Sequence, residues 1–548
     1  MLSYHRFAEP RPLVRELPEL NFNHSGRRLN GLREAGLLGG ELHTLGYYAI
    51  NVCVGSPPRP YNLIVDTGSS VTALPCASCT QCGTHVCGQR GRFDTQQSKT
   101  ARYVGCSTPG VRCAPCSGSK CMYSVHYTEG SSIAGVVVED VVQFAHARDH
   151  VEGDPSTPPN RTAAVKSFFG CQTKETGMFY RQQADGILGV QRSSTGRMPT
   201  LLTSLVAAEK APNSFSLCLT DTSGLFLMGG SLSAERKAEL ARTRGAITVP
   251  FVAGSRAAYT VRLSAINLCT AGPYCDRDAS DKRFARLFPP GPGAATTTSS
   301  SSRSRSSYTP QQTELHPTII DSGTTFVYAS TPVWKAIVEA VKKGLTTAVP
   351  SWRPASGQGG KVCLPLTADA LNKLPRLQFV LDDDTIKEDD PIRTPSTTKK
   401  LLLVKPQQYM VWYPRKDGGV YCIGVYDNQH GGTVIGASIM REREVVFDLQ
   451  ARSGRGEVTF VDAKCAELRA GSAAMQGGYA LAGCPAVPKS GGLSSFIGRR
   501  AQSHSPRNIS AGAAAALRAQ LQAHRARTSA PKSGWMDGIA RLGTQAIG

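Results

Sequence analysis

The sequence predicts an all-β protein made of two similar lobes, and three observations lead to this prediction. First, the 548 residues include 55 Gly and 34 Pro, which favours many turns and short strands over long helices. Second, the pattern Asp-Thr/Ser-Gly-Ser/Thr occurs at Asp66 and again at Asp321, each time directly after three apolar or β-branched residues. Third, two apolar residues and a glycine follow downstream of each copy, at 187–189 and 434–436. This duplication indicates two lobes that contribute one carboxylate each to a shared site.

Short strands are expected throughout the first half. Ile50, Val52 and Val54 alternate with other residues and form one apolar face, as in a half-buried strand. A second strand ends abruptly at Asp66, where Gly68 permits a tight turn. The later β-rich runs are each bounded by turn residues. The strands predicted here are 47–55, 61–65, 121–127, 134–138, 167–170, 215–219 and 225–228.

The second half repeats this pattern and adds one clear helix. Thr331 is a suitable N-cap, Pro332 fits the first turn, and Gly344 is expected to end the helix. Its apolar face consists of Trp334, Ile337, Val338 and Val341. The strands predicted in this half are 246–252, 259–263, 317–320, 377–381, 401–404, 419–425, 434–436, 445–449 and 457–461.

Changes in composition indicate the domain boundaries. Residues 1–43 are expected to be a poorly packed leader or pro-segment, and 44–223 the N-terminal lobe, with a cysteine-rich insert at 76–121. Residues 224–484 are expected to form the C-terminal lobe, interrupted at about 289–310 by a Ser- and Thr-rich segment that cannot bury enough apolar area to order itself. The segment 485–548 is predicted to be a basic disordered tail.

The charge distribution argues against a nucleic-acid-binding protein. The formal net charge is +21, but the tail alone carries nine Lys or Arg and one acidic residue. A solvated basic tail is the favoured interpretation, and a tail that binds an anionic surface is the alternative. No apolar stretch approaches the ~20 residues of a membrane helix, and no membrane anchor is visible.

The two Asp motifs are suited to acid–base chemistry. Two such turns facing each other bring their carboxyl groups within hydrogen-bonding reach, and carboxylates that close cannot both ionise, so the pair holds one proton. The ionised member can take a proton from a bound water, and the protonated member can donate to the carbonyl under attack. Direct amide hydrolysis then needs no covalent intermediate and no cofactor or metal.

From about Tyr47 to Cys465 the sequence resembles the pepsin-like aspartic proteases. The resemblance implies a bilobal fold with a cleft between the lobes, a hairpin flap, and a catalytic pair formed by Asp66 and Asp321. It implies that the loops around the pair are held by residues flanking each Asp, and that Tyr127 is the flap tyrosine. The residues expected to support the loops are Thr67, Gly68 and Ser69 in one and Ser322, Gly323 and Thr324 in the other.

The cysteine-dense insert is a nepenthesin-like feature, and the segment 75–85 looks like that of plasmepsin V and related apicomplexan proteases. That group acts in the endoplasmic reticulum or Golgi and cleaves exported proteins after Leu in Arg-x-Leu motifs. The resemblance places an arginine pocket at Glu129 and at one glutamine of the pair Gln182 and Gln183. The alternatives are a solvated charge at the tip of the flap for Glu129 and a strand-edge hydrogen bonder for the glutamines.

Seventeen cysteines indicate either a disulfide framework in an oxidising compartment or a zinc cluster. The zinc reading rests on the three-residue spacing of Cys76, Cys79, Cys82 and His85, but the protease resemblance and the even local count favour disulfides. The eight cysteines of the insert are expected to form four bridges of unknown connectivity: Cys76, Cys79, Cys82, Cys87, Cys106, Cys113, Cys116 and Cys121. The other expected partners are Cys171 with Cys218, Cys363 with Cys422, Cys269 with Cys275, and Cys465 with Cys484. This count leaves Cys53 as a candidate free thiol.

The favoured prediction is thus a monomeric aspartic endopeptidase of the secretory pathway, with protein substrates that carry Arg-x-Leu-like motifs. The resemblance allows membrane association, yet 1–40 contains no apolar segment typical of a signal peptide. An Arg-x-Leu sequence ending at Leu29 suggests self-removal of the leader, with chance as the competing explanation. The alternatives are a nepenthesin-like protease of general specificity and a pepsin-fold binding or inhibitor protein without catalysis.

Overall fold

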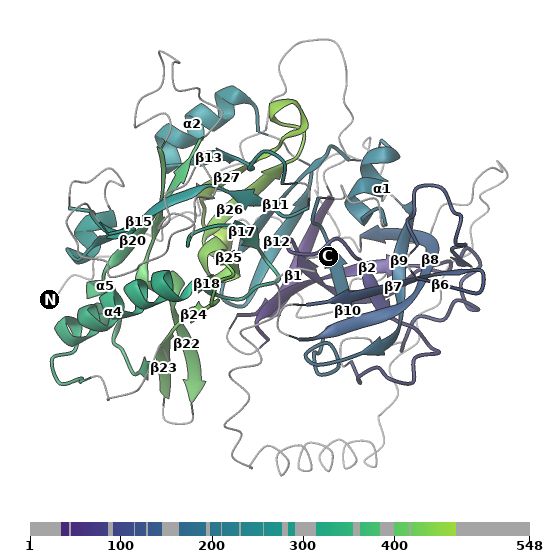
Figure 1. The fold of residues 1–548 in the computed structure, drawn as a ribbon, viewed down its shortest axis with the longest axis horizontal. Coiled ribbons are helices and arrows are strands. Elements are labelled where there is room, and N and C mark those ends of the chain that lie inside the picture. The colour runs from purple at the N-terminus through teal and green to yellow at the C-terminus, as the bar shows by residue number, and fades with distance from the viewer. Residues whose placement is uncertain are drawn as a thin grey trace, which may run out of the picture.

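The fold is built mainly from strands arranged in two halves, which confirms the predicted all-β bilobal class (Figure 1). The computed structural model describes residues 34–42, 45–85, 91–113, 115–127, 130–144, 164–192, 198–209, 211–229, 232–255, 257–276, 283–290, 314–353, 362–383, 399–415 and 418–466. Of the insert predicted at about 289–310, only the first two residues lie within these ranges. The predicted tail and Leu29 lie outside them.

The N-terminal half contributes strands and one short helix, on the right in Figure 1. Its strands are β1 (Glu34–Glu41), β2 (Tyr47–Val54), β3 (Arg59–Asp66), β4 (Ala73–Pro75), β5 (Arg102–Tyr103), β6 (Cys116–Ser117), β7 (Lys120–His126), β8 (Ser132–Phe144), β9 (Val165–Glu175), β10 (Gly186–Gly189), β11 (Ser214–Leu219) and β12 (Ser223–Met228). Its helix is α1 (Leu201–Ala207), which Thr200 caps through its side chain.

The C-terminal half holds most of the helices. Its strands are β13 (Ile247–Pro250), β14 (Thr260–Val261), β15 (Leu263–Cys269), β16 (Ala285–Phe288), β17 (Thr318–Asp321), β18 (Val327–Ala329), β19 (Cys363–Leu364), β20 (Arg376–Asp382), β21 (Lys399–Val404), β22 (Met410–Arg415), β23 (Gly418–Ile423), β24 (Val425–Asp427), β25 (Thr433–Gly436), β26 (Arg443–Asp448) and β27 (Glu457–Asp462). Its helices are α2 (Ala234–Arg244), η1 (Gly272–Asp276), α4 (Thr331–Ala348), α5 (Ala368–Lys373), α7 (Pro406–Tyr409), α8 (Ala437–Met440) and η2 (Arg452–Gly454). Within the described part of the chain, none of these helices has the length and apolar composition needed to cross a bilayer.

One large sheet joins the two halves. Its strand order runs from β13 through β27, β26, β11, β12 and β1 to β2 and β3, and then into the rest of the N-terminal half. The junction is antiparallel: β11 pairs with β12 on one side and with β26 on the other. Phe215 on β11 stacks on Phe447 of β26 with ring centroids 4.6 Å apart, so apolar packing also crosses the junction.

Strand β1 belongs to this sheet although it lies in the segment predicted to be a poorly packed leader. It pairs antiparallel with both β12 and β2, and Leu38 and Leu42 are buried in the core. The pattern Glu-Ala-Gly-Leu-Leu-Gly-Gly-Glu is rich in glycine and does not alternate, so its sequence gave no strand signal. Tertiary pairing on both sides decides its conformation.

The two Asp motifs lie at equivalent places in the two halves. Asp66 is the last residue of β3, which pairs in parallel with β10, and Asp321 is the last residue of β17, which pairs in parallel with β25. The register sets Gly189 beside Asp66 and Gly436 beside Asp321. The downstream apolar-apolar-Gly signal therefore marks, in both halves, the strand that lies next to the Asp strand.

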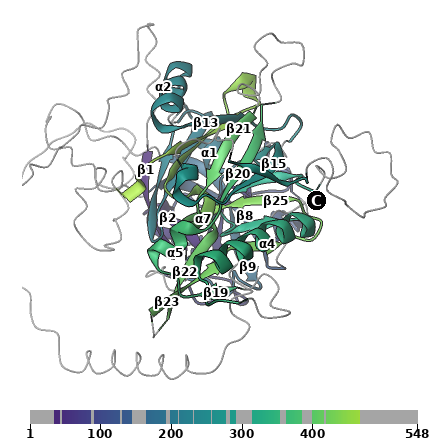
Figure 2. The same ribbon diagram turned by 90° about the vertical axis from the view of Figure 1, so that its left-hand side faces the viewer.

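Helix α4 is present as predicted, but Ser330 rather than Thr331 is its N-cap residue, and the helix runs past its expected end. Val333, Ile337, Val338, Val341 and Leu345 face the core, and Figure 2 shows the helix across the front of the C-terminal half. Gly344 does not terminate it, because its role is packing: a Cβ there would lie 2.4 Å from Cδ of Pro375. The helix continues to Ala348.

Seven disulfides join described cysteines, and their connectivity corrects several predictions. The bonds are Cys76–Cys171, Cys79–Cys82, Cys106–Cys116, Cys113–Cys121, Cys218–Cys465, Cys269–Cys275 and Cys363–Cys422. The last two agree with the predicted pairs. The insert is not closed on itself, because β4 and β9 run in parallel and bring Cys76 to Cys171.

The pairings of Cys171 with Cys218 and of Cys465 with Cys484 were wrong. Cys218 lies on β11, next to β26, and β27 in turn pairs with β26, so Cys465, shortly after β27, reaches Cys218. Cys53 is also disulfide-bonded, so the prediction of a free thiol was wrong. Cys87 and Cys484 lie outside the described residues.

Candidate active site

Asp66 and Asp321 meet at the junction between the halves. Both side chains are buried, with exposed fractions of 2% and 0%, and the two carboxyl groups share a hydrogen bond. Each Asp is the last residue of its strand and lies directly before a turn. Asp66 and Asp321, 255 positions apart in the sequence, thus form one pair. The spatial pairing that the duplicated motif predicts is present in the structure.

Each carboxylate is held by the same two kinds of donor. Gly68 N donates to Asp66 Oδ1 at 2.7 Å, and the Ser69 hydroxyl donates to Asp66 Oδ2 at 2.5 Å. On the other side, Gly323 N donates to Asp321 Oδ1 at 2.9 Å, and the Thr324 hydroxyl to Oδ2 at 2.6 Å. The equivalent bonds fix the orientation of both carboxyl planes.

Glycine is required between each Asp and its hydroxyl residue because the opposite carboxyl group occupies the space. A Cβ on Gly323 would lie 2.3 Å from Asp66 Oδ1, and one on Gly68 would lie 2.7 Å from Cγ and both oxygens of Asp321. Real Cβ contacts are not that short. The two glycines therefore set how closely the carboxyl groups approach.

The environment raises the pKa of both carboxyl groups. Burial raises the pKa of Asp66, against hydrogen bonds that favour its ionised form. Burial and the neighbouring charge of Asp66 raise the pKa of Asp321 well above its usual range. Such a pair holds one proton over a wide pH range, and the proton belongs to the pair rather than to either residue.

Reciprocal hydrogen bonds lock the two loops together. Thr67 N donates to Ser322 Oγ at 3.1 Å, and Ser322 N donates to Thr67 Oγ1 at 2.8 Å. The Ser322 hydroxyl donates onward to the carbonyl of Val65 at 2.8 Å, and the Thr67 hydroxyl to that of Ile320 at 3.1 Å. All four groups are buried, so the two halves cannot separate here without leaving polar atoms unpaired.

Tyr127 lies where the hairpin of β7 and β8 turns. Its carbonyl accepts from Gly130 N at 2.9 Å, and its own N–H donates to the carbonyl of Ser131 at 2.9 Å. The ring is buried and packs against Phe179 with centroids 4.8 Å apart. Glu129, the predicted arginine-binding carboxylate, lies outside the described residues.

Gln182 and Gln183 differ in their surroundings. Gln182 is buried, and its amide donates to the carbonyl of Ala184 at 3.2 Å. Gln183 is exposed, while its backbone N–H donates to the Tyr47 hydroxyl at 3.1 Å, as does Ala184 N at 3.0 Å. Gln183 is thus the member of the pair that presents its side chain at the surface.

The residues that the alternative zinc site would use as ligands have other partners in the structure. Cys76 and the pair Cys79 and Cys82 are in disulfides, and His85 contacts Glu175 instead of sulfur. Among the residues that the structure describes, no three His, Cys, Asp or Glu side chains are grouped so that they could hold a metal.

Several residues that support the site carried no signal in the sequence. The Gln191 amide donates to the carbonyl of Gly68 at 2.9 Å, and the Thr325 hydroxyl donates to that of Gly46 at 2.5 Å. The contact of His85 with Glu175 spans 90 positions. Each depends on tertiary proximity, which local patterns do not encode.

Two family models match the chain. The first, described as xylanase inhibitor N-terminal, covers residues 48–230, and the second, described as xylanase inhibitor C-terminal, covers 302–453. Together they span more than half of the chain, and the first contains Asp66 while the second contains Asp321.

Known relatives include three informative proteins. Aspartic protease 5 of Toxoplasma gondii is 34% identical over 212 residues, which are 35% of this chain and 20% of that protein. Plasmepsin V of Plasmodium falciparum is 29% identical over 196 residues, which are 35% of this chain and 30% of that protein. Aspartic proteinase 36 of Arabidopsis thaliana is 26% identical over 464 residues, which are 81% of this chain and 80% of that protein. The matches to the two parasite proteins thus span less than a third of their length.

Proposed function

Because the chain belongs to the pepsin-like aspartic protease family, we propose that it is an aspartic endopeptidase in which Asp66 and Asp321 activate water between them. The observation that carries this proposal is the buried, hydrogen-bonded pair of carboxyl groups. All the flanking groups that a working pair needs are present, including both glycines and both hydroxyls.

The chemistry follows from one proton shared by the pair. The ionised carboxylate removes a proton from a water molecule as the water attacks the scissile carbonyl carbon. The protonated carboxyl donates its hydrogen to the carbonyl oxygen, which neutralises the developing oxyanion. Collapse of the tetrahedral intermediate then breaks the C–N bond: the amine leaves with a proton from the pair, and one hydroxyl of the intermediate returns its proton to the pair as the carbonyl reforms.

We further propose that the substrates are secretory or exported proteins cleaved after Leu in Arg-x-Leu-like motifs. The support is the similarity to aspartic protease 5 and plasmepsin V, together with the segments at 75–85 and 127–131. In this proposal Glu129 pairs with the substrate guanidinium, and the glutamine pair, through the exposed side chain of Gln183, adds a hydrogen bond. Seven disulfides among the described residues support an oxidising, secretory compartment.

A fluorogenic peptide with an Arg-x-Leu sequence tests both parts of the proposal. The full chain should cleave it after Leu, and the isosteric variants Asp66→Asn and Asp321→Asn should each abolish cleavage. Replacing the peptide's Arg by Ala, or replacing Glu129 by Gln, should raise KM. Cleavage that survives both Asp variants would refute the aspartic mechanism, and equal cleavage of the Arg and Ala peptides would refute the specificity while leaving the mechanism.

A second candidate is a pepsin-fold binding protein, because both family models carry the description of an inhibitor. A protein that only binds a partner does not need a proton shared by two carboxyl groups. It would also not need glycine at the two positions where a Cβ would collide with the opposite carboxyl group. If the wild-type chain binds a protein partner and cleaves no peptide from a diverse library, this second candidate replaces the first.

A further inference from the structure

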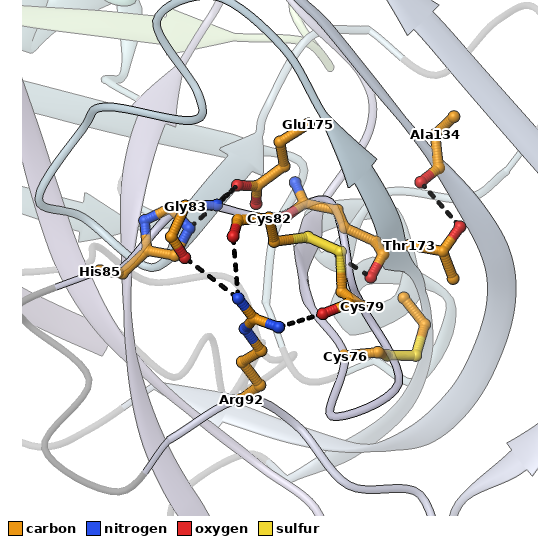
Figure 3. The surroundings of a disulfide bond; sticks show 11 residues. Cys76, Cys79, Cys82, Gly83, His85, Arg92, Ala134, Thr173 and Glu175 are labelled. Carbon is orange, nitrogen blue, oxygen red and sulfur yellow. Dashed lines mark hydrogen bonds and ion pairs between the residues drawn. A yellow bond between two sulfur atoms is a disulfide. The ribbon is translucent and has the colours of Figure 1, made fainter.

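The segment Cys79–His85, here called the 79–85 loop, is unusually well anchored. The Cys79–Cys82 disulfide closes its first turn. The Arg92 guanidinium donates to three of the loop's carbonyls: those of Cys79, of Cys82 at 2.9 Å and of Gly83 at 3.3 Å (Figure 3). The backbone of the loop is therefore held from one side by a single fixed cation.

On its other side the 79–85 loop contacts a buried carboxylate. Glu175 Oε2 accepts from Gly83 N at 2.9 Å and lies 3.1 Å from His85 Nε2 (Figure 3). The side chains of Glu175 and His85 are only 1% and 4% exposed. A buried carboxylate is costly unless paired, and both hydrogen-bonding partners described for the Glu175 side chain belong to the 79–85 loop.

His85 also reaches the candidate substrate-contact segment. Its Nδ1 lies 3.3 Å from the carbonyl oxygen of Gln182. A carbonyl and an ionised carboxylate can only accept hydrogen bonds, so both contacts are hydrogen bonds only when both ring nitrogens carry a proton. In the neutral ring one of the two contacts is lost.

These two contacts span the segment that links the hairpin to the glutamines. Immediately after Glu175, Thr176 exchanges hydrogen bonds with Ser132 at the start of β8: Thr176 N donates to the Ser132 carbonyl at 2.9 Å, and Ser132 N donates to Thr176 Oγ1 at 2.8 Å. Met178 N donates to Ser131 Oγ at 2.9 Å. The segment therefore touches the base of the hairpin at one end and carries Gln182 and Gln183 at the other.

We propose that His85 is a positioning residue: its doubly protonated ring holds Glu175 and the Gln182 carbonyl together, and so fixes the glutamine pair relative to the hairpin for substrate binding. This inference rests on the proposed peptidase function for its kinetic consequence. It also makes a structural claim that does not depend on catalysis. Because the hydrogen bonds described above for Gly83 and His85 reach Glu175 and Gln182 and neither Asp66 nor Asp321, we expect the effect on substrate affinity rather than on the chemical step.

The charged groups around His85 favour its protonated form. Burial alone would lower the pKa of the imidazole, but Glu175, and more weakly Asp185 before β10, raise it above its ordinary value. Arg92 and Tyr61 of β3 line, together with His85 and Asp185, a cavity of about 170 Å³. Since the pKa is higher in the fold than in the unfolded chain, the stabilisation is complete below the ordinary value of 6.5 and is lost as pH rises through the raised pKa.

The kinetic test compares His85→Gln with wild type across pH. Glutamine keeps one donor but cannot become a cation. Because both proteins share the catalytic pair, its titration cancels in the ratio of their kcat/KM values. In mildly acidic buffer we expect KM to rise about tenfold in the variant, equivalent to about 1.4 kcal/mol, with kcat unchanged. The ratio should approach one in alkaline buffer, and His430→Gln, at an exposed site in the C-terminal half, should match wild type throughout.

The structural test measures hydrogen exchange of the full chain in the catalytically silent Asp66→Asn background. His85→Gln should speed exchange over residues 176–185 in mildly acidic buffer, and His430→Gln should not. Unchanged exchange would overturn the proposal. Faster exchange with unchanged KM would also overturn it, because the contacts would then be structural only. If the wild-type chain cleaves no peptide, the proposed function fails, and hydrogen exchange still decides whether His85 fixes this segment.

Discussion

The glycines beside the carboxyl pair give the sharpest test of the proposed chemistry. Replacing Gly323 by Ala would put a Cβ 2.3 Å from Asp66 Oδ1, against a minimum of about 3.0 Å for real contacts. Asp66 must then retreat by about 0.7 Å or more. It cannot do so freely, because Gly68 N and the Ser69 hydroxyl hold its two oxygens at 2.7 and 2.5 Å.

The expected loss follows from this displacement. A misplacement of about 1 Å at a reacting group costs about 100-fold in rate. We therefore expect kcat of Gly323→Ala to fall about 100-fold, which is about 2.7 kcal/mol in activation free energy. Gly68→Ala intrudes less, with its Cβ 2.7 Å from the Asp321 carboxyl, and should lose less activity. Each variant should lose up to about 2.6 kcal/mol of stability, since one added methyl costs about 1–3 kcal/mol and Gly→Ala recovers about 0.4–1 kcal/mol through the unfolded chain.

Initial rates on the Arg-x-Leu peptide at saturation, with thermal unfolding of each variant, provide the measurement. Gly105→Ala is the matched control, because a Cβ there meets its nearest atoms at 3.7 and 3.8 Å. If Gly323→Ala folds and turns over at the wild-type rate, the close approach of the carboxyl groups is not what drives the chemistry. An equal loss in Gly105→Ala would show that the effect is not specific to the pair.

Three further predictions concern the same framework. Thr67→Val and Ser322→Ala should each lower kcat and remove about 1 kcal/mol of stability per lost hydrogen bond; their effects in a double-mutant cycle should be less than additive, and strict additivity would contradict a shared lock. The wild-type kcat should fall as pH rises through the raised pKa of the pair, since the proton donor is then lost. Thr324→Val removes a bond that favours the ionised form of Asp321 and should move this limb to higher pH, so a shift to lower pH would be the contrary result. The double variant Cys218→Ser with Cys465→Ser opens a link across 247 positions and should cost about 4 kcal/mol in denaturant unfolding with kcat retained.

Local patterns predicted the strands and the pair well because each depends on neighbouring residues. The alternation around Ile50 and the apolar run before Asp66 correspond to β2 and β3. Glycine was harder to interpret, since the same residue type serves different purposes. Gly68 relieves a collision with the opposite carboxyl group, and Gly344 makes room for Pro375 inside a continuing helix. Only the partner across the fold distinguishes these uses.

Long-range partners explain the errors. Cys76 bonds to Cys171 because two strands run in parallel. Cys218 bonds to Cys465 because β26 pairs both with β11, which carries Cys218, and with β27, which ends shortly before Cys465. Neither pairing follows from spacing in the sequence, which favours local partners. The same reason applies to β1, whose conformation comes from strands on both sides.

The duplicated halves are equivalent in their chemistry and unequal in what surrounds it. Each carboxyl group receives the same two donors, a glycine N–H and a hydroxyl, so we do not expect this arrangement to distinguish one substrate from another. The hairpin with Tyr127, the 79–85 loop and the glutamine pair all belong to the N-terminal half. Changes in the Asp loops should therefore act on kcat, and changes around His85 on KM. If His85→Gln reduced kcat as severely as Gly323→Ala, substrate recognition and chemistry would not be divided between these elements, and the asymmetry would have to lie in the pair itself.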